Sequence, residues 1–91
     1  MTEFLVELYV SRLDGAAVEA GADRARRAAD ELSSEGRPVQ YLRSLFVPAE
    51  EACFYLYEAA SADDVREAAR RAGLPPENVV EAITDDTATS V

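Results

Sequence analysis

The sequence predicts an α+β domain in which two helices cover one face of a four-stranded antiparallel sheet. Segments of alternating apolar residues, typical of strands, occur at 4–10, 39–59 and 78–84, and the middle one is long enough for a hairpin. Two segments with helical spacing, 16–35 and 61–72, separate them. The resulting order, β-α-β-β-α-β, is that of a ferredoxin-like sandwich, for which we expect the strand order 4-1-3-2.

The first helix is predicted over 16–35, where apolar residues recur at steps of three and four. Most of this stripe is alanine, so the helix can approach the sheet closely. We expect Asp14 to cap its N-terminus, and Gly36 followed by Pro38 to end it. The stripe comprises Val18, Ala22, Ala25, Ala29 and Leu32.

The hairpin 39–59 breaks at Pro48, because proline favours a turn and cannot donate a ladder hydrogen bond. Residues directly opposite each other share a face, so we expect Val47 to pair with Glu51 or with Cys53.

The second helix is predicted to begin after a Ser61 cap and to end at Gly73. A favourable surface pair, Glu67 with Arg71, lies on it. The last strand follows, and we expect one domain over 1–85 with a frayed tail at 86–91.

The aromatic residues separate by position along the strands. Every Phe lies at an even position and every Tyr at an odd one. Phe suits a dry core, whereas the polar tip of Tyr suits interfaces and ligand sites. We therefore expect the even face to pack on the helices and the odd face to remain uncovered within the chain. The odd face would carry Leu5, Tyr9, Tyr41, Leu45, Tyr55, Tyr57, Val79 and Ile83.

An uncovered apolar face of this kind usually marks an interaction surface. The simplest cover is a second copy of the chain, packed sheet to sheet around a two-fold axis. The sequence thus predicts a homodimer in the form of an α+β barrel.

The polar residues of the odd face are the candidate ligand-binding residues. Glu7 and Glu81 would lie on neighbouring strands, where a carboxylate pair could hold a divalent metal ion. Arg43 could instead neutralise them or bind an organic anion. A polar cluster that only fixes the dimer register is the alternative, and no catalytic residue is assigned. The complete candidate ligand set is Glu7, Tyr41, Arg43, Tyr55, Tyr57 and Glu81.

Composition excludes several classes. A net charge of −9 argues against binding to nucleic acid. The lone Cys53 excludes an intramolecular disulfide, and this favours a reducing cytoplasm as the location of the protein. We expect Cys53 to be a small buried apolar residue. No signal peptide or membrane span is expected. The chain has no His, which excludes His-based triads and His-ligated metals.

Parts of the sequence resemble the small actinobacterial nickel-binding (nickel-responsive) proteins, a domain-of-unknown-function family with a dimeric ferredoxin-like fold. The resemblance covers about 4–83 and is most specific from Arg66 to Glu81, which includes the run REAARRAGLP at 66–75. It implies the dimer and a metal site on the sheet. Relatives often have His at the position of Arg43, and a family Cys falls at Tyr55. Nickel prefers nitrogen and sulfur donors, so these replacements disfavour nickel here.

Three interpretations follow. The first is a non-enzymatic cytoplasmic homodimer that binds a small ligand or divalent ion on the odd face. The second is a cofactor-independent enzyme of the oxygenase or cyclase type, by fold analogy alone. The third is a structural or regulatory dimer whose interface is completely filled.

Overall fold

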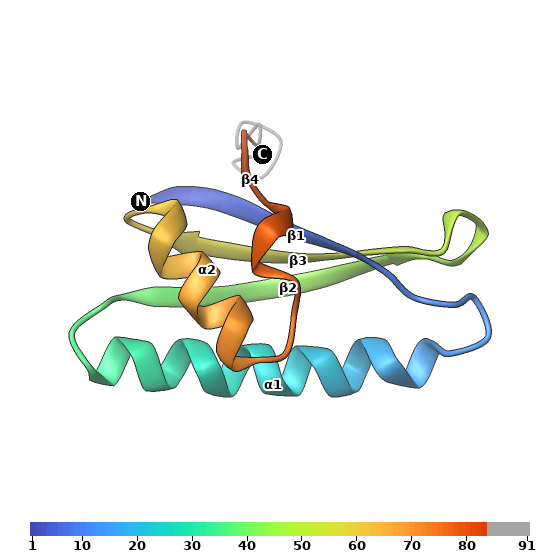
Figure 1. Ribbon diagram of the computed structural model, residues 1–91, viewed down its shortest axis with the longest axis horizontal. Coiled ribbons are helices and arrows are strands. Elements are labelled where there is room, and N and C mark those ends of the chain that lie inside the picture. The colour runs from blue at the N-terminus through green and yellow to red at the C-terminus, as the bar shows by residue number, and fades with distance from the viewer. Residues whose placement is uncertain (84–91) are drawn as a thin grey trace, which may run out of the picture.

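Six elements make up the described part of the chain. They are β1 (Thr2–Tyr9), α1 (Gly15–Ser34), β2 (Val39–Val47), β3 (Ala52–Ala59), α2 (Ala62–Arg71) and β4 (Val79–Ala82), with short 3-10 turns at Pro48–Glu50 and Pro76–Asn78. The structure, a computed structural model, describes residues 1–83, so the predicted tail lies outside it (Figure 1). One antiparallel sheet has the order β2-β3-β1-β4. The predicted fold class and strand order are confirmed.

Both helices pack on the same face of the sheet. Figure 1 shows α1 running along the molecule beside β2, with α2 lying across the sheet. The predicted alanine-rich stripe of α1 is buried, except that Ala22 is only half-buried. Arg71 of α2 joins the two helices: its guanidinium lies 2.6 Å from Glu31 on α1 and 2.8 Å from Glu35, which caps the C-terminus of α1. It also makes the predicted pair with Glu67, at 2.8 Å.

The helix ends follow the sequence signals with one exception. The Ser61 side chain accepts a hydrogen bond from the Asp64 backbone N–H at 3.3 Å, as a cap should. Gly36 and Gly73 have φ values of 90° and 74°, the left-handed conformation that ends a helix. Asp14 occupies the N-cap position of α1, but its side chain makes no capping bond, so that part of the prediction is wrong.

The hairpin register differs from the prediction. Val47 pairs with Ala52, because the turn between them contains four residues. Glu51 completes this turn in the left-handed conformation, with a φ of 50°. An even number of turn residues pairs even positions with odd ones. Side chains at odd positions of β3 therefore share a face with even positions near the end of β2.

A β-bulge in β2 changes again which positions of β2 share a face with the odd positions of β3. Tyr41 lies opposite Tyr57, but the next paired residue, Arg43, lies opposite Leu56. Leu42 is the extra residue, and such an insertion turns the following side chains to the other face. Tyr41 thus points to the helix side of the sheet and Arg43 to the open side.

The predicted division into faces holds for β1 and fails for β3 and β4. Phe4 and Val6 are buried on the helix side, as expected. On β3, however, the residues at odd positions lie opposite the helix-side residues of β1, and those at even positions lie opposite its open-side residues. The residues of β4 are arranged in the same way. The helix side therefore receives Cys53, Tyr55, Tyr57, Val79 and Glu81, and the open side receives Phe54, Leu56, Val80 and Ala82.

Candidate functional site

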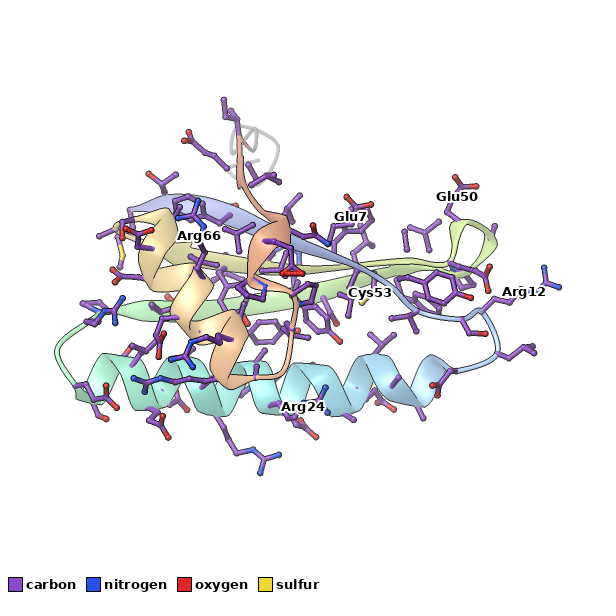
Figure 2. The ribbon with its side chains drawn as sticks, viewed as in Figure 1. Glu7, Arg12, Arg24, Glu50, Cys53 and Arg66 are labelled. Carbon is purple, nitrogen blue, oxygen red and sulfur yellow. The ribbon has the colours of Figure 1, made fainter. Side chains whose placement is uncertain are left out.

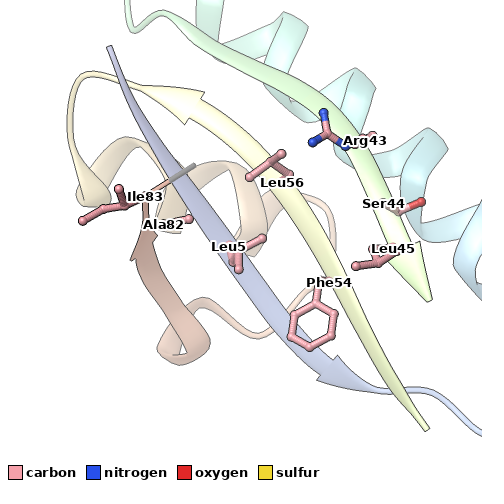
Figure 3. A pocket seen from close by; sticks show the side chains of 8 residues that line it. All are labelled: Leu5, Arg43, Ser44, Leu45, Phe54, Leu56, Ala82 and Ile83. Carbon is pink, nitrogen blue, oxygen red and sulfur yellow. The ribbon is translucent and has the colours of Figure 1, made fainter. Parts of the chain in front are cut away.

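The open face of the sheet carries a hollow of about 360 Å³. Figure 3 shows side chains from all four strands around it, with Arg43 on the β2 side and Ile83 just beyond β4. Both helices lie behind the sheet in this view. Leu45 and Ile83 are 62% and 93% exposed. The lining residues are Leu5, Arg43, Ser44, Leu45, Phe54, Leu56, Ala82 and Ile83.

Arg43 is the single charged residue among those that line the hollow. Its guanidinium makes no hydrogen bond or ion pair within residues 1–83. Most other arginines are held by neighbours; Arg37, for example, lies 2.9 Å from Asp64. The hollow thus combines an apolar floor with one unpaired cation, and a guanidinium is well suited to bind a carboxylate through two parallel hydrogen bonds.

Two tyrosines predicted on the open face are in the core instead. Tyr55 and Tyr57 are only 1% and 0% exposed, and burial raises the pKa of both phenols. The Tyr55 hydroxyl donates to the backbone carbonyl of Val18 in α1 at 2.9 Å. Gly21 permits this approach, since a Cβ there would collide with the same hydroxyl. One backbone acceptor is enough to bury the polar tip of this tyrosine, so a tyrosine on a strand does not require an interface or ligand site.

Tyr41 also lies on the helix side, at its edge. Its ring centroid is 5.7 Å from that of Tyr57 and 6.2 Å from that of Tyr55. The Arg26 guanidinium of α1 covers the Tyr41 ring at 5.3 Å, a cation–π contact. The Tyr57 hydroxyl is buried without a hydrogen-bond partner among the described residues. These tyrosines form part of the packing between sheet and helix, and the prediction that they line the open face is wrong.

The predicted carboxylate pair is separated by the sheet. Glu7 lies opposite Phe54 and belongs to the open face. Glu81 lies on the neighbouring strand, as predicted, but it is opposite Phe4, so it belongs to the helix side. Alternating side chains of paired strands cannot place both carboxylates on one face in this register. Of the candidate ligand residues, the open face keeps Glu7 and Arg43.

Some lining residues were missed, and two signals could have identified them. Glu58 shares its side of β3 with Phe54 and Leu56, and a charged residue at that position argues against a buried even face. The length of the hairpin turn, read as four residues, would have given the correct register. The bulge at Leu42 has no comparable signal in its sequence.

Cys53 is buried, as predicted, on the helix side. Burial raises the pKa of its thiol, which disfavours the thiolate that a metal requires.

Together these features define a class: a ferredoxin-like α+β domain with an uncovered sheet face. Comparison with protein families makes the assignment more specific. Residues 8–82 match the model of the family described as "Nickel responsive protein SCO4226-like". The chain belongs to this family, as the resemblance in its sequence indicated.

Among solved structures, the chain is similar to SCO4226 from Streptomyces coelicolor A3(2). The two share 18% sequence identity with a TM-score of 0.65, over 91% of this chain and 98% of that one. At this identity the similarity supports the fold. No curated protein matches the sequence.

The side chains of this protein do not fit a nickel centre within one chain. The sequence contains no His, and Cys53 is buried behind the sheet. Residues 1–83 contain no group of three His, Cys, Asp or Glu side chains placed to hold a metal ion. Within residues 1–83, the chain therefore offers nickel no imidazole donor, and its one thiol is buried. Across the same residues, no helix is long and apolar enough to cross a membrane.

Proposed function

We propose that this protein is a non-enzymatic binding protein that dimerises through the open face of its sheet and holds a small ligand or ion between the two copies. The observation that carries the proposal is the uncovered apolar hollow with Arg43 beside it. Membership of the nickel-responsive family supports a binding role over catalysis.

The apolar character of the face supports a second copy as its cover. Leu45, Val80 and Ile83 are each more than half exposed. Large exposed aliphatic side chains on a flat sheet are unfavourable in water, and a two-fold axis would bury both copies of the patch at once. The hollow would then become a closed chamber, in which polar interactions are stronger than in water.

Native mass spectrometry of the purified protein tests this proposal, with and without added divalent metal ions. We expect a dimer that retains a small molecule or an ion. A matched sample at high ionic strength should remain dimeric, because the interface is apolar. A monomer at micromolar concentration would contradict the proposal, and so would a dimer that binds neither small molecules nor ions.

A further inference from the structure

The hollow on the open face has the size of a small-molecule site. Its volume of about 360 Å³ lies within the range of about 300–1,000 Å³ that is typical of such pockets. Leu5, Phe54 and Leu56 form its floor from the two central strands (Figure 3). Ala82 at the end of β4 and Ile83 just after it extend this floor. A ligand with an apolar body fits this lining.

Arg43 adds a specific requirement. Although the chain has 18 acidic and only 9 basic residues, the Arg43 guanidinium has no partner within residues 1–83. Of the residues that line the hollow, only Arg43 can neutralise a charged group. A ligand that satisfies both features has a carboxylate or similar anionic group at one end of an apolar body.

The bulge in β2 provides an independent argument. If β2 were paired regularly through Leu42, Tyr41 and Arg43 would share one face of the sheet. The bulge separates them, so that Tyr41 packs on the helix side while Arg43, opposite Leu56, lies on the open face. Bulges recur next to functional sites, where they redirect a side chain, and they cost local ladder hydrogen bonds. The strand thus departs from regular pairing directly before the residue that brings a cation to the hollow.

We propose that the ligand of this face is an apolar organic monoanion, of the carboxylic-acid class, with its carboxylate bound by Arg43 and its apolar body on Leu5, Phe54 and Leu56. This inference rests on the proposed function, because the second copy would close the chamber over the ligand. It departs from nickel, for which this part of the chain lacks the donors. No covalent step is involved.

Calorimetric titration with three probes of equal chain length tests the inference. Octanoate carries the anion, octan-1-ol is its neutral counterpart and octylamine its cationic one. We expect octanoate to bind to the wild type with one site per chain, at least tenfold more tightly than octan-1-ol, and octylamine to bind weakest. Arg43→Gln should weaken octanoate at least tenfold and leave octan-1-ol unchanged, because the charge-assisted hydrogen bonds are lost.

Arg12→Gln is the matched control. Arg12 is also exposed and its guanidinium has no partner within residues 1–83, but it lies in the loop after β1 and does not line the hollow. Figure 2 shows it at one end of the molecule. This variant should bind octanoate like the wild type. Equal loss in both variants, or equal binding of octanoate and octan-1-ol to the wild type, would overturn the inference.

Sedimentation of the same samples separates the two proposals. A dimer that binds a metal ion but no octanoate would overturn the ligand class and leave the proposed function intact. A monomer would overturn the proposed function, and with it the closed chamber.

Discussion

The two faces of the sheet differ in a way that their compositions conceal. The helix side buries Tyr55 and Tyr57, each with a hydroxyl group, whereas the open side leaves the aliphatic side chain of Leu45 62% exposed. Some polar groups are therefore buried while some large apolar side chains are exposed to solvent. Strand register decides which side chains face the helices, and a backbone carbonyl of a helix can accept a hydrogen bond from a buried hydroxyl. The residue types alone therefore do not reveal which face of the sheet the helices cover.

The difference also shows what each face does. On the helix side, Gly21 and Val18 of α1 are fitted to the Tyr55 hydroxyl, so the polar tip of this side chain is satisfied by the helix that covers it. On the open side, the Arg43 guanidinium has no hydrogen-bond or ion-pair partner within residues 1–83, and no element among them covers the hollow. The side chains of the helix side pack within the chain and support the fold, and for the exposed open face we propose a partner and a ligand.

The largest expected effect comes from removing one aromatic ring from each face. Tyr57→Ala should lower the free energy of unfolding by about 3–5 kcal/mol, because it empties a fully buried site. Phe54→Ala, on the open face, should act mainly through association. Urea unfolding at several protein concentrations distinguishes them: only the Phe54 variant should approach the wild type at low concentration. Equal, concentration-independent losses would contradict the assignment of the faces.

The next effect tests the contact between α1 and β3. Gly21→Ala should destabilise the protein by about 1–3 kcal/mol, because the new methyl group collides with the Tyr55 hydroxyl. Gly15→Ala is the control, since nothing lies within 4 Å of a Cβ there, and it should be near neutral. Adding Tyr55→Phe to Gly21→Ala should recover part of the loss in chemical denaturation. Strictly additive losses in the double variant would mean that the two residues do not interact.

A smaller effect is expected on the stability of the fold at low pH. Arg70 and Arg71 lower the pKa of Glu67 from its ordinary 4.5 to about 2, and Arg71 lowers that of Glu35. A depressed carboxyl pKa stabilises the fold above pH 4.5, and this stabilisation is lost as the pH falls toward 2. Melting temperatures measured across this window should fall less steeply for Arg71→Ala than for the wild type.

Arg66→Ala is the control for the acid experiment, because Arg66 pairs with Asp63 within α2 and does not join the helices. It should keep the wild-type slope. If both variants show that slope, Arg71 does not link the stability to pH.

The smallest effect is spectroscopic. Burial raises the pKa of Tyr55 and Tyr57 above the ordinary 10, so the neutral phenols favour the folded state, and this contribution is lost only above pH 10. In an alkaline titration followed by phenolate absorbance, these two should ionise together with unfolding. Tyr57→Phe should remove one phenol from that late step. Early ionisation of both in the folded protein would show that they are accessible to water.

Much of the fold could be predicted from the sequence, since local signals specify it. The Ser61 cap, the glycines that end both helices and the alanine stripe of α1 act through neighbouring residues. The site could be predicted only in part, because face assignment depends on counting residues through a turn and a bulge. One extra residue at Leu42 places Tyr41 and Arg43 on opposite faces, and no local propensity encodes it. The proposed ligand chamber needs a second copy of the chain, which a single sequence does not display.

Sedimentation equilibrium of Leu45→Asp beside Ala20→Asp tests the central claim, that the open face meets a second copy of the chain. Leu45 is exposed on the open face, and Ala20 is exposed on α1, away from the sheet. The account predicts a dimer for the wild type and for Ala20→Asp, and a folded monomer for Leu45→Asp, where a carboxylate would be buried without a partner. A Leu45→Asp protein that remains as dimeric as the wild type would contradict it.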